Sequence, residues 1–302
     1  MHTKDAEILS ARPQPKFRII AKNIAISYSY NIYMKNESPS NDSITFLGTG
    51  GGRFTMITQV LASGGLWLNL GCTEILVDPG PGCIIQATKR KFKAEKLSAI
   101  LLSHRHLDHS ADVNIMVEAM TRGGHQRHGR FFAPSDALET EPIIFSYLKD
   151  RLDSIEILEE GKSYSVGTVS FSTPLRHIHL VETYGIVFKT ENHTFSYIAD
   201  TKYFDGLCQH YSGELLIVNV AFLEPRPPEA KTWLPTDHLA VPDAERIIWE
   251  LKPRVAILTH FGMTMWQAKP WQIAKTLTEK TGVKVIAARD GMKFDLAALD
   301  DG

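Results

Sequence analysis

A strongly apolar segment is followed at once by a cluster of histidines, and this pairing restricts the fold more than any other feature of the 302-residue chain. The run Leu97–Leu102 is typical of a buried strand, and the next residues, 103 to 109, are Ser-His-Arg-His-Leu-Asp-His. Three imidazoles and one carboxylate within six residues cannot be buried without partners, because each would keep unsatisfied polar atoms. Bound metal ions satisfy such groups. The fold must therefore hold the end of this strand rigidly and leave room for cations beside it.

The rest of the chain predicts a layered α/β fold, because short β-branched and apolar runs alternate with helical stretches. The predicted strands are 44–47, 66–70, 74–77, 97–102, 130–133, 169–173, 185–189, 195–199, 215–220, 255–259 and 283–287. The predicted helices are 83–92, 111–120, 136–150, 242–251 and 270–281. No repeat or long linker interrupts this pattern. We therefore predict one domain over residues 43–302, preceded by an extension or extra strand over residues 1–42.

Composition excludes several classes of protein. The 33 Lys+Arg against 34 Asp+Glu leave a net charge of −1, which argues against a broadly basic nucleic-acid binder. No 18 consecutive apolar residues occur and the N-terminus lacks a signal-like stretch, so a soluble, cytoplasmic protein without a membrane partner is expected. Three widely spaced cysteines, with no Cys-x-x-Cys pair, predict reduced core residues. The twelve histidines are about twice what average usage would give.

Polar residues follow several of the predicted strands directly. Asp78 follows Val77, Asp200 follows Ala199, and His104 and His260 stand at the ends of two further strands. Strand ends hold side chains rigidly, so these four positions can converge on one site. Histidine and aspartate ligands without cysteine suit zinc, manganese or iron, and the His-x-His-x-Asp-His spacing favours two ions a few ångströms apart.

Six motifs, in this order, resemble those of the metallo-β-lactamase-fold hydrolases. They are FLGTGGG at 46–52, LVDPGPG at 76–82, HRHLDH at 104–109, His179 ahead of Tyr184-Gly185, IADT at 198–201 and LTHFG at 258–262. The matches span about residue 44 to residue 295. This resemblance implies the four-layer αββα sandwich of that superfamily, within the α/β class, and a hydrolase domain over residues 43–302.

The same resemblance implies a ligand set for two divalent metal ions. The first ion would be held by His104, His106 and His179, the second by Asp108, His109 and His260, and Asp200 would bridge both. Zinc is the expected metal, with manganese or iron as alternatives. Asp78 matches the aspartate that steadies the ligands from outside the coordination sphere. His177 competes with His179 for one position; the six-residue interval to Gly185 favours His179, and a contribution from His177 stays open.

Three features resemble the ribonuclease Z and phosphoribosyl cyclic phosphate phosphodiesterase branches. The glycine-rich opening and the sequence Asp237-His238-Leu239, in which His238 lies 22 residues before His260, resemble both branches, and the closing DGMKFDL resembles the cyclic phosphate phosphodiesterases. Two cations would neutralise the nonbridging phosphate oxygens and lower the pKa of a bridging water, so that hydroxide attacks phosphorus. His238 would then protonate the leaving alkoxide. Asp108 and His238 are therefore the predicted catalytic residues.

The predicted substrate is a small or cyclic phosphodiester. Asp200 lies only 21 positions after His179, which leaves no room there for the tRNA-gripping arm of ribonuclease Z. The net charge of −1 points the same way. Three alternatives remain open: a ribonuclease Z-like RNA endonuclease, a lactone or thioester hydrolase on the same metal site, and a binding platform without turnover.

Two loops are candidate substrate contacts. The stretch 121–130, with Arg127, and the stretch 224–231, with Arg226, both carry guanidinium groups that suit phosphate oxygens. Solvated surface loops are the alternative interpretation of both. By analogy with the resembling enzymes, a homodimer is expected.

Overall fold

A computed structural model of the chain describes residues 42–225 and 237–300. The predicted extension over residues 1–42 lies outside the described residues except for Asp42, so its structure stays a prediction.

Two seven-stranded mixed sheets form the centre of the fold. From edge to edge, the first sheet contains β14 (Lys293–Asp295), β1 (Ser43–Phe46), β2 (Leu66–Leu70), β3 (Thr73–Val77), β4 (Leu97–Leu101), β5 (Arg130–Pro134) and β6 (Ser154–Leu158). The second contains β13 (Lys284–Ala287), β12 (Val255–Thr259), β11 (Leu215–Asn219), β10 (Thr194–Ile198), β9 (Ile186–Lys189), β8 (Val169–Thr173) and β7 (Lys162–Val166).

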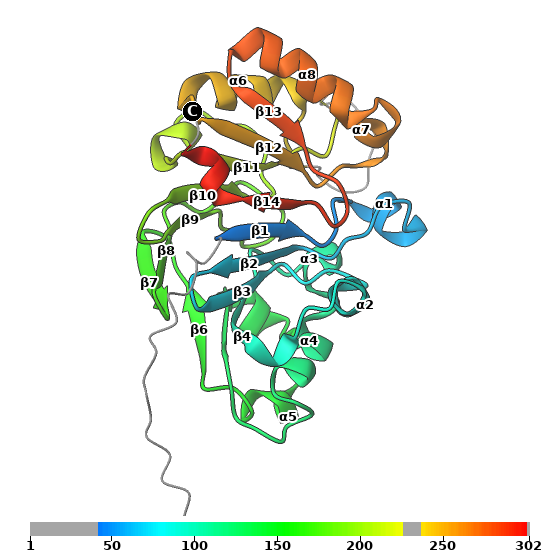
Figure 1. Cartoon of the computed structure of the whole chain (residues 1–302). Coiled ribbons are helices and arrows are strands. Elements are labelled where there is room, and N and C mark those ends of the chain that lie inside the picture. Colours follow the sequence, from blue (N-terminus) through cyan, green and yellow to red (C-terminus); the bar gives the residue numbers. More distant parts are fainter. Residues whose placement is uncertain (1–41, 226–236, 301–302) are drawn as a thin grey trace, which may run out of the picture. The chain divides into compact units, whose positions relative to one another are not determined.

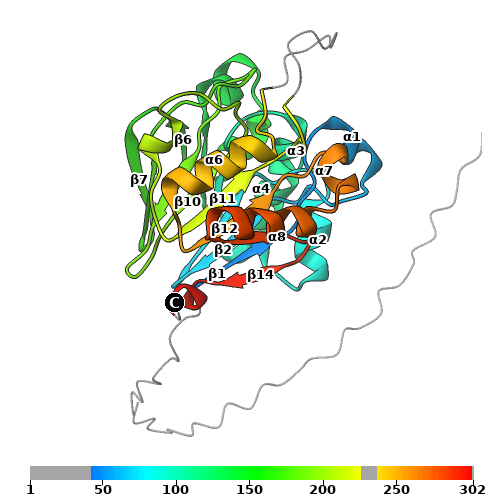
Figure 2. The ribbon, with the colours of Figure 1, turned by 90° about the horizontal axis from the view of Figure 1, so that it is seen from above.

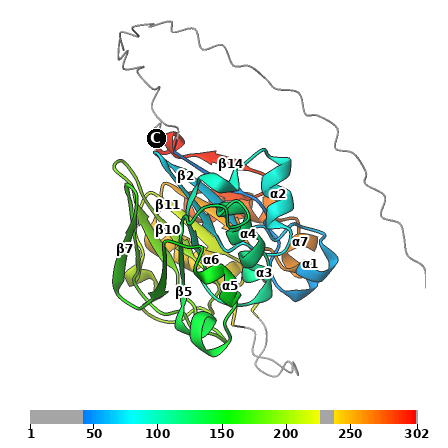
Figure 3. The ribbon, with the colours of Figure 1, turned by 90° about the horizontal axis from the view of Figure 1, so that it is seen from below.

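Helices cover the outer face of each sheet. Helices α2 (Cys83–Lys89), α4 (Val113–Met120) and α5 (Ser146–Lys149) pack on the first sheet (Figures 1 and 3). Helices α6 (Val241–Leu251) and α8 (Pro270–Thr281) pack on the second, as the view from above shows (Figure 2). The shorter helical segments are α1 (Arg53–Thr58), η1 (Ala94–Lys96), α3 (Leu107–Ser110), η2 (Asp136–Thr140), η3 (Leu207–His210), α7 (Met263–Gln267) and η4 (Leu296–Leu299).

The alternation of side chains along each strand explains the layers. In β11, Leu215 and Ile217 belong to the core between the sheets, whereas Leu216 and Val218 pack against the helices outside. Successive strand residues face opposite sides, so a strand covered on both faces is apolar throughout. The predicted four-layer αββα sandwich is confirmed.

The predicted helix over residues 136–150 is wrong. The structure has a short π-helical turn, η2, and then the four-residue helix α5, with a non-helical Glu141 (φ −131°) between them. Pro142 follows Glu141, and proline disfavours the helical conformation of the residue before it, as well as lacking the N–H for a helical hydrogen bond.

Because of the strand directions, the residues predicted as metal ligands lie at the carboxyl-terminal ends of the parallel strands in each sheet. In the first sheet β3, β4 and β5 are parallel, and Asp78 and His104 follow the carboxyl ends of β3 and β4. In the second sheet β10, β11 and β12 are parallel, and Asp200 and His260 follow β10 and β12. Strand β9 is antiparallel to β10, so His179, which precedes β9, lies beside the carboxyl end of β10. None of the helices in the described part of the chain is both long and apolar enough to cross a membrane.

Candidate metal centre

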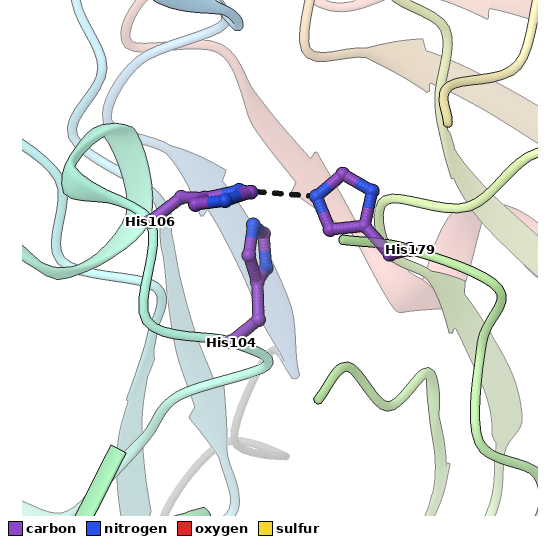
Figure 4. A group of neighbouring side chains, drawn as sticks. All are labelled: His104, His106 and His179. Atoms are coloured by element: carbon purple, nitrogen blue, oxygen red, sulfur yellow. Dashed lines mark hydrogen bonds between the residues drawn. The ribbon is translucent and has the colours of Figure 1, made fainter. Parts of the chain in front are cut away.

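Three histidines from two sheets form the first group. His104 and His106 lie between β4 and α3, and His179 lies before β9 (Figure 4). Nδ1 of His106 is 3.0 Å from Nε2 of His179, and one ring nitrogen of each of the three lies within 4.8 Å of the others. Such a spacing allows one cation to contact all three rings.

Asp108, His109 and His260 form the second group. Nε2 of His109 lies 2.9 Å from Nε2 of His260, which in turn lies 3.3 Å from Oδ2 of Asp108. His260 has a left-handed backbone, with φ of 60°, immediately after β12. A non-glycine residue rarely adopts this conformation, so the surrounding contacts hold His260 in a strained position that aims its ring at the group.

Asp200 lies between the two groups. Its Oδ2 is 3.8 Å from Nε2 of His104 and 3.5 Å from Nε2 of His109. Its Oδ1 is 3.4 Å from Nδ1 of His260. One carboxylate therefore faces members of both groups, as a bridging ligand must.

The outward nitrogens of the rings are held by hydrogen bonds. His179 Nδ1 donates to the carbonyl oxygen of Asp237 at 2.8 Å, since a carbonyl can only accept. Asp78 contacts Nδ1 of His109 at 3.0 Å and accepts from the Ser103 hydroxyl at 2.7 Å. With its own proton committed to Asp78, the Ser103 oxygen accepts from Nδ1 of His104 at 3.0 Å. Each of these bonds fixes a tautomer in which the neutral ring presents a lone pair to the site.

Burial and neighbouring charges shift the pKa values of the histidines and aspartates in the cluster. Burial lowers the pKa of His104 well below its usual value and that of His106 to about 4. Burial alone would raise the pKa of Asp200, but neighbouring histidines, His260 first, bring it well below its usual range. For His109 burial opposes the charge, yet Asp200, Asp108 and Asp78 raise its pKa well above normal. Neutral imidazoles and ionised carboxylates are the forms that bind metals, so a cation bound beside His109 would take the place of the proton that these carboxylates favour.

Orphaned buried atoms show that the residues fit divalent cations. Nε2 of His104, Oδ2 of Asp200 and Nδ1 of His260 are buried and have no hydrogen-bond partner among the described residues. Such atoms are costly to bury unpaired, and all three lie in the cluster. A donor set of imidazoles and carboxylates without thiolates suits zinc, manganese or iron.

The comparisons with known proteins agree with this geometry. The family model of the β-lactamase superfamily domain matches residues 73–261. The chain belongs to the β-lactamase superfamily. The resemblance noted in the sequence is thereby confirmed, and membership of this metallo-hydrolase superfamily implies divalent metals.

Two curated relatives of this superfamily member come from archaea. A protein of uncharacterized function from Methanocaldococcus jannaschii is 31% identical over 264 residues, which cover 84% of the chain and 94% of the relative. A ribonuclease Z from Methanosarcina mazei is 28% identical over 149 residues, or 46% of the chain and 48% of the relative.

Two solved structures share the fold. The metallo-β-lactamase fold protein YhfI from Bacillus subtilis has a TM-score of 0.70 at 22% identity, covering 84% of the chain and 99% of YhfI. A diphosphatase from the PhnP family has a TM-score of 0.61 at 18% identity, covering 84% of the chain and 96% of the diphosphatase.

The glycine-rich loop after β1 supports the second group in this superfamily member. The N–H of Gly52 donates to Oδ2 of Asp108 at 2.8 Å. A Cβ added at Gly51 would lie 2.2 Å from the ring of His260, so only glycine allows this approach. Asp290, in the closing DGM motif, holds the loop by accepting from the backbone and hydroxyl of Thr49.

His238 joins the metal cluster, whereas His177 faces away from it. Nδ1 of His238 lies 3.3 Å from Oδ2 of Asp200, and burial lowers the pKa of His238 to about 4. His177 donates from Nδ1 to the backbone carbonyl of Asp200 at 3.2 Å and accepts at Nε2 from the hydroxyl of Tyr211. Both His177 nitrogens are thus occupied, while His179 presents its Nε2 to the cluster.

Arg127 is not brought to the cluster. It precedes β5, at the amino end of that strand, whereas the cluster lies at the carboxyl ends. Its Nε donates to the carbonyl of Leu152 at 2.8 Å, next to β6. We therefore leave Arg127 out of the proposed site. Arg226 and most of the loop 224–231 lie outside the described residues.

The sequence reasoning missed two buried polar residues beside the cluster, Asn219 and Tyr197. Asn219 donates to Oδ1 of Asp200 at 2.9 Å, and the Tyr197 hydroxyl donates to Oδ2 of Asp78 at 2.8 Å. Asn219 ends the apolar strand β11 in the structure, but it lies inside the predicted strand 215–220, so the rule that singled out Asp78 and Asp200, a polar residue directly after a strand, did not point to it. Tyr197 lies inside β10 and carries no comparable signal.

Proposed function

We propose that this protein is a two-metal phosphodiesterase acting on a small or cyclic phosphodiester. The observation that carries the proposal is His238, whose Nδ1 lies 3.3 Å from Asp200 Oδ2 and whose ring centroid is 5.1 Å from that of His179. A histidine beside both candidate metal groups is within reach of a substrate held there. The similarity to a ribonuclease Z and to a PhnP-family diphosphatase, both hydrolases of phosphate bonds, supports the same chemistry.

The proposed ligands divide as the two groups do, with Asp200 between them. His104, His106 and His179 would hold one cation, and Asp108, His109 and His260 the other. When bound, two divalent cations supply positive charge for the phosphoryl oxygens and lower the pKa of an attacking water. Asp108 stays ionised because neighbouring histidines outweigh its burial, so it can also accept a hydrogen bond that orients this water.

His238 would protonate the leaving alkoxide. Burial keeps its pKa at about 4, so the ring is neutral near pH 7 before substrate binds. A phosphodiester brings a negative charge next to the ring, and a nearby opposite charge favours the protonated form. The proton is then available at the departing oxygen, where it removes the largest obstacle to expelling an alkoxide.

The short connection between His179 and Asp200 supports a small substrate. Strands β9 and β10 and the turn between them occupy most of the 20 residues between His179 and Asp200. An inserted arm that grips a large RNA therefore has no place in this part of the chain.

A leaving-group comparison tests the proposal, with zinc- or manganese-loaded enzyme. His238→Ala is expected to lose about 10²–10⁴-fold in kcat/KM on an alkyl phosphodiester. On bis(4-nitrophenyl) phosphate, whose leaving group needs no proton, it should lose much less. Equal losses on both substrates, with both metals retained, contradict the proton-donor role.

A substrate panel tests the reaction class. Linear, cyclic and RNA phosphodiesters are compared with a lactone and a thioester, with and without chelator. Preference for a small or cyclic phosphodiester supports the proposal, whereas preference for RNA favours the ribonuclease Z-like alternative. Metal-dependent turnover of the carbonyl substrates alone, or of none of the compounds, refutes phosphodiester hydrolysis.

A further inference from the structure

A continuous chain of buried hydrogen bonds joins the two aspartates that lie on opposite sheets. Nδ2 of Asn219 lies 2.9 Å from Oδ1 of Asp200 and 3.2 Å from the hydroxyl of Tyr197. The Tyr197 hydroxyl lies 2.8 Å from Oδ2 of Asp78. All four residues are 3% exposed or less, so water does not compete for these bonds.

The direction of each bond in this chain follows from the chemistry of its members. The ionised carboxylates of Asp78 and Asp200 can only accept, so the Asn219 atom that faces Asp200 must be the amide nitrogen. That nitrogen has two hydrogens and two acceptors, Asp200 Oδ1 and the Tyr197 oxygen. Burial raises the pKa of Tyr197 well above its usual value, so the phenol keeps the proton that it donates to Asp78. Each bond therefore has one direction.

In this arrangement the two oxygens of Asp200 have different surroundings. Oδ1 is engaged by the Asn219 amide, whereas Oδ2 is buried, has no hydrogen-bond partner among the described residues and faces His104 and His109. The two oxygens are chemically equivalent, so the amide does not select one of them; it fixes the rotation angle at which one oxygen faces the histidines. Hydrogen bonds to a ligating carboxylate are known to fix its orientation and to affect metal affinity.

We propose that Asn219, oriented by Tyr197, is a positioning residue that fixes the Asp200 carboxylate with Oδ2 toward both metal groups. The inference rests on the proposed two-metal site. It links that site to the sheet core, since Asn219 ends β11 and Tyr197 lies in β10. Through Asp78, which also contacts His109 and Ser103, the same chain spans both halves of the cluster.

Two substitutions at Asn219 separate the hydrogen bond from the volume of the side chain. Asn219→Asp keeps the shape but replaces the donor with a carboxylate that repels Asp200, and Asn219→Ala removes the donor. Thr121→Val is the matched control, because Thr121 is also fully buried and its hydroxyl donates to the Val117 carbonyl, in α4. The readouts are the Kd of Mn²⁺, the bound metal per chain and the electron paramagnetic resonance spectrum of the manganese-loaded protein, which reports coupling between two bridged ions.

Both Asn219 variants are expected to raise the Kd of Mn²⁺ about 10–100-fold and to weaken the coupling, and Thr121→Val to change neither. Wild-type Kd and coupling in the Asn219 variants overturn the inference, while two bound ions and turnover in the wild type leave the proposed function standing. A wild-type protein that binds no metal overturns both. If the Asn219 variants do not fold, Tyr197→Phe decides: a several-fold higher Kd supports the inference, and an unchanged Kd overturns it.

Discussion

Replacing Gly51 with alanine should weaken metal binding at the second group, because the added methyl group displaces the His260 ring. The added Cβ would lie 2.2 Å from the His260 ring, whereas ordinary contact begins at 3.4 Å. The ring must therefore move by about 1.2 Å, the difference between these two distances. It cannot do so without changing its 3.3 Å and 3.4 Å approaches to Asp108 and Asp200.

The expected cost in activity is about 100-fold, because a misplacement of about 1 Å at a reacting centre has that effect. Overpacking should also lower the free energy of unfolding by about 1–3 kcal/mol. The assay measures bound metal, the Kd of zinc by chelator competition, and turnover of bis(4-nitrophenyl) phosphate, together with urea unfolding.

Gly161→Ala is the control for Gly51→Ala. Gly161 has φ of 73° and nothing within 4 Å of an added Cβ, so alanine there strains the backbone by about 1–2 kcal/mol without a steric clash. Gly161 is also distant in sequence from the candidate metal ligands. The control should lose stability but keep metal binding and turnover. If Gly51→Ala binds zinc with the wild-type Kd and turns over normally, the second metal group does not depend on the close approach of Gly51 to His260.

Two further predictions concern stability. Burial lowers the pKa of His177 to about 4, so the unfolded chain binds a proton between about pH 6.5 and 4 that the folded protein does not. His177 alone should therefore contribute a fall of up to about 3 kcal/mol in the stability of the metal-free protein as the pH drops through this range, in addition to the other buried histidines. His177→Gln should make the profile shallower by that amount in urea titrations with chelator; parallel profiles contradict it. Asp290→Ala removes the acceptor for Thr49 and for the N–H of Ala62, so unfolding should become about 2 kcal/mol easier; an unchanged urea midpoint would mean that the loop does not depend on Asp290.

The interior strands were predictable, and three of the edge strands were not. Strands β6, β7 and β14 lie at sheet edges and were missed, whereas every strand between the edges was predicted. A central strand is buried on both faces and becomes an apolar run, as in LLIVN of β11. An edge strand such as KSYSV of β7 carries polar residues, so its sequence resembles a loop.

The candidate ligands and their positions along the chain follow from the sequence alone. Clustered histidines after an apolar strand, and aspartates at the ends of others, indicate a metal site because such groups need partners when buried. The order of the motifs along the chain is by itself enough to indicate the superfamily.

Only the tertiary structure decided which of these side chains meet. His177 and His179 share one short segment, and packing against Tyr211 turns the first away while the Asp237 carbonyl holds the second toward the cluster. Arg127 was only a candidate phosphate contact in the sequence, and strand direction places its loop at the amino end of β5, away from the cluster. The hydrogen bonds that run from Asn219 through Tyr197 to Asp78 join residues of both sheets. The residue type determines which ligands a side chain can bind. The distance between residues far apart in the chain is set by how the strands pair and the sheets pack.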